Sequence, residues 1–142
     1  MAGIVAAILD IAAAIGIYAY LLNLTTPEKI LQSIAAGIYG RNAFYGGTSM
    51  AITGFLLHTW IAIFFATAFV LAYKHINKLI PGKWLQGILY GIVVWSVMNF
   101  VVLPLSHARV PAFHLTDALL SLTIIVCCVG IPIALITRKM MR

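Results

Sequence analysis

Residues 48–73 read TSMAITGFLLHTWIAIFFATAFVLAY and contain no Asp, Glu, Lys or Arg. As an α-helix, a stretch of about 20 predominantly apolar residues is long enough to cross the hydrocarbon core of a bilayer, which is roughly 30 Å thick. A soluble domain could not cover its surface with residues of this kind. We therefore predict that residues 48–73 form a transmembrane helix.

The rest of the chain has the same character. Its 142 residues are 63% hydrophobic and 8% charged, with a mean hydropathy of +1.08, whereas a soluble domain carries about 25% charged residues. Three further apolar stretches lie at about 3–22, 83–105 and 116–137. Four spans with short loops use up the length and leave no room for a separate soluble domain. We predict an all-α integral membrane bundle of four transmembrane helices, with residues 1–142 forming a single transmembrane domain.

A short helix is expected between the first and second spans, at about 27–39. Thr25 and Glu28 have capping-box spacing, and Pro27 suits a first turn, where its missing N–H costs nothing. The segment is too short to span a bilayer, and its apolar residues share one face: Ile30, Leu31, Ile34 and Ile38. We expect it to lie at the interface or against the bundle; the sequence leaves open whether it re-enters the membrane.

The basic residues are divided unequally between the two sides of the predicted bundle. Six lie on one side: Lys74, Lys78, Lys83, Arg138, Lys139 and Arg142. Three lie on the other: Lys29, Arg41 and Arg109. The positive-inside rule places the richer side, with both chain termini, in the cytoplasm. Because these residues flank apolar spans, the net charge of +6 predicts contact with anionic lipid headgroups in the bilayer and not with nucleic acid.

Two ionisable residues fall inside predicted spans. A carboxylate at the centre of a transmembrane helix costs about 2.5–3.5 kcal/mol on the insertion scale, so Asp10 is expected to point into the bundle. Small neighbours suit close packing of its face: Ala6, Ala7, Ala13 and Ala14. At 1.5 Å per residue, His58 lies within a few ångströms of the depth of Asp10. A buried Asp10–His58 couple is therefore possible, either as a proton-relay or ligand site or as a purely structural contact.

The third span carries a GxxxG run and an amide. The run from Gly87 to Gly91 permits two helix backbones to approach closely, and we interpret it as a packing feature more than a dimerisation motif. Asn99 shares a face with Gly91 and Trp95 and is expected to donate a hydrogen bond to a neighbouring helix.

The remaining polar candidates gather on the side with fewer basic residues. They are Arg41, His107, Arg109, His114 and Asp117. Thr116 and Asp117 are interpreted as the N-cap and the first-turn acid of the fourth helix. Histidines could also ligate a metal or haem, but their spacing here matches no such motif. No cofactor is predicted, and a metal or haem site remains the alternative.

Several stretches resemble a known group of proteins: Leu9–Ala13, Ser33–Tyr39, Gly46–Thr48, Gly54–His58, Tyr90–Asn99 and Val102–Ser106. In these stretches the chain is similar to small uncharacterised bacterial inner-membrane proteins, loosely YagU-like, that are built from four hydrophobic helices. The resemblance implies a multi-pass protein of the bacterial inner (plasma) membrane. It carries no established activity and no catalytic residues.

Three functions follow from these observations. The preferred one is a non-enzymatic helical bundle that acts as a homo-oligomer or as an accessory subunit of a larger membrane complex, since the loops are short and no catalytic motif is present. The second is an oligomeric proton-coupled transporter or channel that uses Asp10 and His58. The third is a membrane-embedded redox or lipid-modifying enzyme that uses the His, Arg and Asp residues of the less basic side.

Overall fold

The computed structural model describes residues 1–110 and 112–141, which form helices and turns without a strand. Four helices in it are long and apolar enough to cross a membrane: Ala2–Leu21, Gly47–Leu79, Lys83–Leu105 and Leu115–Met140. The predicted all-α architecture with four such helices is therefore confirmed. These four helices indicate a membrane protein.

The four helices are divided into shorter elements by changes in helix type. The first consists of α1 (Ala2–Ala14) and the π-helical segment η1 (Ile15–Leu21). The short helix α2 (Pro27–Tyr39) and the 3-10 segment η2 (Gly40–Tyr45) lead into α3 (Gly47–Leu79). The third crossing helix comprises α4 (Lys83–Val97), η3 (Met98–Val102) and α5 (Leu103–Leu105). The last comprises α6 (Leu115–Ile125), η4 (Val126–Gly130) and α7 (Ile131–Met140).

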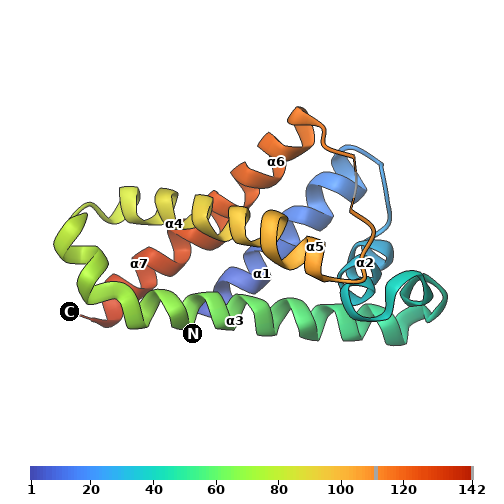
Figure 1. The fold of residues 1–142 in the computed structure, drawn as a ribbon, viewed down its shortest axis with the longest axis horizontal. Helices are drawn as coiled ribbons and strands as arrows, with labels where there is room; N and C mark the ends of the chain where they lie inside the picture. Colours follow the sequence, from blue (N-terminus) through green and yellow to red (C-terminus); the bar gives the residue numbers. More distant parts are fainter. Residues whose placement is uncertain (111, 142) are drawn as a thin grey trace.

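The elements form two crossed pairs (Figure 1). The helices α3 and α4 are antiparallel neighbours in the chain, while α1 and the α6–α7 helix run obliquely across them. Met1 and Met140 line one small cavity together with residues of α3. The beginning of the chain and the end of α7 therefore lie at the same end of the bundle.

Prolines are accommodated within two of the crossing helices by π-helical segments. The π segment η3 directly precedes the turn that contains Pro104, and η4 directly precedes the turn that contains Pro132. Proline removes one backbone N–H and clashes with the carbonyl four residues before it. A wider π turn relieves this conflict. The last helix continues beyond Pro132 to Met140, whereas the third crossing helix ends at Leu105, one residue after Pro104.

Glycines allow the backbones of α4 and the last helix to pack closely where the two helices cross. A Cβ added to Gly130 would collide with the carbonyl oxygen of Gly87 and would lie 2.8 Å from the Cα of Gly91. Added to Gly91, it would lie 2.7 Å from the Cα of Val126. Backbone meets backbone here, as is common where small residues line helix contacts in membranes. The GxxxG run is thus a packing feature within one chain, as predicted.

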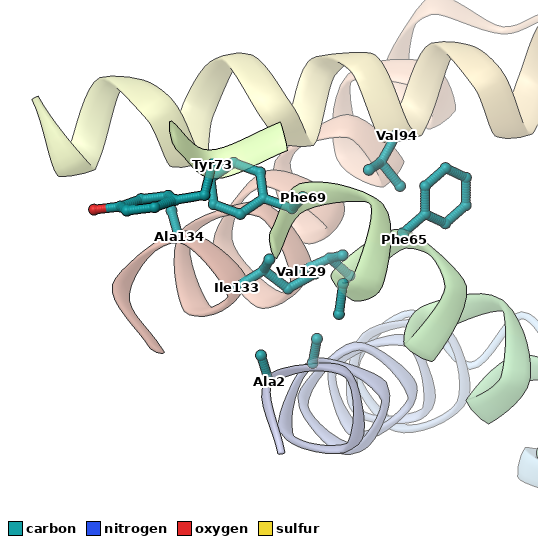
Figure 2. Close-up of a cluster of buried hydrophobic side chains, with 10 residues drawn as sticks. Ala2, Phe65, Phe69, Tyr73, Val94, Val129, Ile133 and Ala134 are labelled. Carbon is teal, nitrogen blue, oxygen red and sulfur yellow. The ribbon is translucent and has the colours of Figure 1, made fainter. Parts of the chain in front are cut away.

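The main core lies where α1, α3, α4 and the last helix meet (Figure 2). It combines a few large side chains with several alanines: Ala2, Ala6, Phe65, Ala66, Phe69, Tyr73, Val94, Val129, Ile133 and Ala134. The rings of Phe69 and Tyr90 pack at a tilt with their centroids 4.6 Å apart, and the Tyr90 hydroxyl donates to the carbonyl of Phe65. Many other large apolar side chains point outward, for example Trp60, Phe64 and Leu71. This distribution suits a lipid environment, where apolar side chains need no shelter from water.

The helix α2 packs against α3, which agrees with the expectation that it lies against the bundle. The buried residues of α2 are Gln32, Ala35 and Ala36, while Ile38 is more than half exposed. A Cβ on Gly54 would collide with the carbonyl oxygen of Leu31, so only small residues fit this crossing. Ile30 and Ile34 are half-buried beside this face, and the Gln32 amide donates to the carbonyl of Gly47, 3.1 Å away.

The N-cap of α2 is Thr26 and not Thr25. The residue before a proline favours an extended backbone, and Thr26, which precedes Pro27, has φ −110° and ψ 156°. Its hydroxyl accepts a hydrogen bond from the Lys29 N–H. Glu28 is consequently one position too early for a capping box, and its carboxylate instead accepts a hydrogen bond from Gln32.

The glycine crossing can be tested with two matched substitutions. Gly130→Ala should lower the free energy of unfolding by about 1–3 kcal/mol, the usual cost of overpacking. Gly16→Ala is the control, because a Cβ there meets nothing within 4 Å; it should leave stability unchanged or raise it by up to about 1 kcal/mol, the gain of Ala over Gly in a helix. The measurement is equilibrium unfolding in mixed detergent micelles. Equal effects of the two substitutions would contradict the close crossing.

Candidate functional site

The structure places Asp10 and His58 in contact inside the bundle. The Nε2 atom of His58 lies 3.5 Å from Oδ2 of Asp10 and 3.2 Å from the carbonyl oxygen of Ala7. The two side chains are 15% and 17% exposed. The contact between spans that the sequence suggested is thus present.

The carbonyl oxygen of Ala7 and Oδ2 of Asp10 interact differently with the His58 ring, because they lie at different distances from Nε2. A carbonyl oxygen only accepts, so the contact is a hydrogen bond when Nε2 is the protonated ring nitrogen and its N–H points to the Ala7 oxygen. The Asp10 oxygen lies beyond the usual N–H···O range of 2.7–3.2 Å, so its contact with the ring is chiefly electrostatic. His58 therefore ties α3 to the backbone of α1 and at the same time gives the Asp10 carboxyl a polar neighbour in an apolar environment.

Small residues on α1 bring the two helices close enough for this contact. Ala6 and Ala7 are fully buried, and a Cβ on Gly3 would lie 2.7 Å from the Cα of Ile63. With α1 this close, the His58 ring can reach the carbonyl of Ala7 across the interface. The alanine face predicted around Asp10 is the feature that makes the pair possible.

A second candidate site is a cavity of about 490 Å³ at the end of the bundle where α6 begins. Its lining residues come from η1, the α4–α5 helix, the connection that follows it, and α6. We call it the aromatic cavity. Its described lining residues are Tyr18, Trp95, Asn99, Phe100, Leu103, Pro104, Val110, Ala112, Phe113, His114, Asp117, Ala118 and Ser121.

One wall of the aromatic cavity is held by a hydrogen bond between helices. The indole N–H of Trp95 donates to the Ser121 hydroxyl over 2.9 Å, and that hydroxyl donates to the carbonyl of Ala118. Phe100 packs edge-on against the Trp95 ring, with centroids 5.9 Å apart. Trp95 thus joins α4 to α6 and forms part of the lining.

The structure corrects the expected role of Asn99. Its amide donates to the carbonyl of Trp95, 2.9 Å away and on the same helix. The bond between helices that was expected from Asn99 is made by Trp95 instead, because the longer indole reaches Ser121. Asn99 remains in the cavity wall, and its carboxamide oxygen accepts no hydrogen bond from the described residues.

The polar rim of the aromatic cavity comes from the start of α6. The N-cap is His114 and not Thr116, because the extended backbone at His114 (φ −116°, ψ 126°) lets the helix begin at Leu115. Asp117 lies in the first turn as predicted, where a negative charge suits the helix dipole. The His114 side chain makes no capping hydrogen bond. Both side chains line the cavity.

The predicted candidates are therefore divided among three places. Asn99, His114 and Asp117 share the aromatic cavity, whereas Asp10 and His58 form their own pair. His107 and Arg109 are exposed and outside the cavity lining, and the His107 N–H donates to the carbonyl of Gly37 in α2. Within the described residues, no group of three or more His, Cys, Asp or Glu is placed to hold a metal ion.

Sequence reasoning missed Tyr18, Trp95 and Ser121 as site residues. A signal was available: tyrosine and tryptophan seek a hydrogen-bond partner for their polar atom when they are buried. This signal is weak in this chain, because Tyr20 and Trp60 also lie in apolar helices and are mostly exposed. The partner of Trp95 depends on how α4 and α6 align, which a single sequence does not specify.

A double-mutant cycle tests the Asp10–His58 contact. Asp10→Asn and His58→Gln should each destabilise the protein, and the double variant should lose less than the sum of the two. A coupling of roughly 0.5–2 kcal/mol is expected for polar groups in direct contact within a membrane. Unfolding midpoints in mixed micelles give the values. Strictly additive losses would contradict the contact.

Comparison with known proteins identifies a family. Residues 21–132 match the family described as "Protein of unknown function (DUF1440)". Neither a curated protein nor a solved structure matches the chain. The matched range contains His58 and the cavity residues of α4–α6, whereas Asp10 and Tyr18 precede it. The expectation of an uncharacterised family is confirmed, and the narrower likeness to YagU-like proteins stays a prediction. Since the match covers more than half of its length, the chain belongs to this family of proteins of unknown function.

Proposed function

We propose that this chain is a non-enzymatic transmembrane bundle that binds an amphipathic molecule in the aromatic cavity. The observation that carries the proposal is the lining of this cavity, in which aromatic rings surround a few polar groups. Binding sites for small molecules are commonly 300–1,000 Å³ in volume, mostly apolar, and furnished with a few orienting polar groups. A cavity of about 490 Å³ falls within this range.

The lining favours a particular kind of ligand. Tyr18, Trp95, Phe100 and Phe113 offer ring faces and edges to an apolar body. Asp117 supplies a carboxylate, and the described lining contains no Lys or Arg. A polar head that donates hydrogen bonds or carries a positive charge fits such surroundings, because both the carboxylate and the aromatic faces attract it. We therefore propose an amphiphile with an amine or a neutral donor head, such as a membrane lipid or a hydrophobic amine.

The hydrogen bonding of the lining supports binding over catalysis. Ser121 is the candidate nucleophile in the wall, but its oxygen already accepts from Trp95 and its proton is donated to Ala118. A catalytic serine instead needs a base that takes its proton. His114 lies at the beginning of the same helix, two turns away, and lines the rim. We accordingly rank the enzyme hypothesis, including its redox form with a haem or metal, below binding.

Location and assembly complete the proposal. We propose the bacterial inner membrane, with both termini cytoplasmic and residues 1–142 as a single transmembrane domain. The unequal basic residues support this orientation, and those at the richer side that the structure describes lie near the α3–α4 turn and the end of α7; Arg142 lies outside the described residues. The bundle would act as a homo-oligomer or as an accessory subunit in a larger complex.

Filling the cavity should abolish ligand binding. Ala118 lines the cavity, so Ala118→Phe should occupy the space of the apolar body. Ala68→Phe introduces the same side chain at an exposed position of α3 and serves as the control. Mass spectrometry of organic extracts from the purified proteins should find one enriched amphiphile with wild type and with Ala68→Phe, and at least about tenfold less of it with Ala118→Phe, a loss of 1.4 kcal/mol or more.

Asp117→Asn separates recognition of the head from the apolar contact. It keeps the size of the side chain and removes its charge, so an amine-bearing ligand should be retained several-fold less well. If no amphiphile is enriched with wild type, or if Ala118→Phe and Ala68→Phe retain equal amounts, the cavity is not a binding site and the proposal fails.

The Asp10–His58 contact favours a second candidate function. An ionisable pair within the membrane can pass a proton between its members, and four helices would need to oligomerise to enclose a pathway. If the pair conducts, proteoliposomes with wild-type protein should carry a proton flux that Asp10→Asn reduces about tenfold or more, a range that general acid–base groups commonly contribute. Asp117→Asn should leave this flux unchanged. Equal flux for wild type and Asp10→Asn would remove this candidate.

A further inference from the structure

At the end of the bundle opposite the aromatic cavity, a groove is bordered almost entirely by basic side chains. It has a volume of about 230 Å³ and is lined by Lys83, Leu135, Arg138 and Lys139. Lys83 begins α4, and the other three belong to α7, which packs beside it (Figure 1). We call this depression the basic groove.

The positive charge of the basic groove is not balanced by acidic side chains of the chain. The sequence contains only three Asp and Glu residues. Asp10 is in contact with His58, Glu28 accepts a hydrogen bond from Gln32, and Asp117 lines the aromatic cavity. None of the three acidic side chains, all of which the structure describes, is therefore paired with the basic groove.

Two features of the groove favour an anion over a general surface charge. Lys83 occupies the first turn of α4, where a positive charge is unfavourable for the helix dipole. That turn contains no acidic residue, and its N-cap Gly82 has no side chain to satisfy the free N–H groups. A bound anion would offset both. Arg138 and Lys139, at the last turn of α7, already suit the dipole of their own helix.

The side chains around the groove are partly pre-ordered. The Arg138 guanidinium donates to the carbonyl of Pro81 over 3.2 Å, which fixes it beside the α3–α4 turn. The Lys83 ammonium stands 5.6 Å from the centre of the Trp84 ring. Trp84 is more than half exposed, and tryptophan at such positions commonly lies at the level of lipid headgroups.

We propose that the basic groove binds the headgroup phosphate of an anionic phospholipid. The phosphate would lie between the Lys83 and Lys139 ammonium groups and the first N–H groups of α4. The acyl chains would follow the apolar surfaces of α4 and α7 into the membrane, beginning at Leu135. This inference is independent of the aromatic cavity, whose lining favours a neutral or positive head.

The test compares two double variants with equal loss of charge. Lys83→Gln/Lys139→Gln removes two groove ammonium groups and leaves Arg138 bonded to Pro81. Lys74→Gln/Lys78→Gln removes two charges from the end of α3, outside the groove lining. Each protein is stripped of lipid and titrated with an equimolar mixture of phosphatidylglycerol and phosphatidylcholine. Native mass spectrometry counts the lipids that remain bound.

Wild type should retain one phosphatidylglycerol in preference to phosphatidylcholine. The groove variant should lose this preference by about tenfold or more, given the contribution of each basic residue to anionic-lipid binding, while the α3 variant should keep it. Equal losses in both variants would indicate general charge attraction and overturn the site, as would no preference in wild type. Binding of inorganic phosphate at millimolar concentration without retention of phosphatidylglycerol would also overturn it, since the groove would then be a site for free phosphate.

Discussion

The close approach of helix backbones at small residues is the constraint on which this structure depends. Gly130 fits against Gly87 and Gly91, and Gly54 fits against the backbone of α2, at spacings that leave no room for a Cβ. In a membrane, large apolar side chains gain little from burial, so association relies on close packing of small ones. The same constraint explains why Ala6, Ala7, Ala35 and Ala134 are buried while many larger apolar residues face outward. The contacts that hold the helices together are therefore made mainly at glycine and alanine residues.

This packing also determines where chemistry can occur. Close contact between α1 and α3 brings His58 to the carbonyl of Ala7 and places Asp10 beside the ring. Along α4 the contact changes character within about one turn. Gly91 meets the backbone of Val126, whereas the bulky Trp95 reaches α6 through a side-chain hydrogen bond to Ser121. Beyond the glycine crossing the helices are separated by side chains, and the aromatic cavity lies there. Its polar rim is supplied by the first residues of α6.

The sequence was informative wherever periodicity, length or charge decides the outcome. Apolar runs predicted the four crossing helices, and the insertion cost of a carboxylate predicted that Asp10 would point into the bundle. The similar depths of Asp10 and His58 allowed a contact between them. The sequence was less informative about which side of a helix packs against its neighbour and about which side chains form hydrogen bonds between helices. The most deeply buried residues of α2 are Gln32, Ala35 and Ala36 and not its isoleucines, and at Gly54 the backbone of α2 comes too close for any side chain on α3. The bond expected from Asn99 is made by Trp95, since the alignment of α4 with α6 fixes which side chain reaches Ser121. Such alignments arise from tertiary packing, and so does the cavity.

The most direct test of the account is an electron-density map from crystals grown in a lipidic mesophase. We expect elongated density for a bound amphiphile in the aromatic cavity. The apolar part of the amphiphile should lie against Trp95 and Phe100, and its polar head should lie near Asp117. A cavity that is closed by its own lining side chains, or that holds only ordered water, would contradict the central claim that this bundle is a binding protein for an amphiphile.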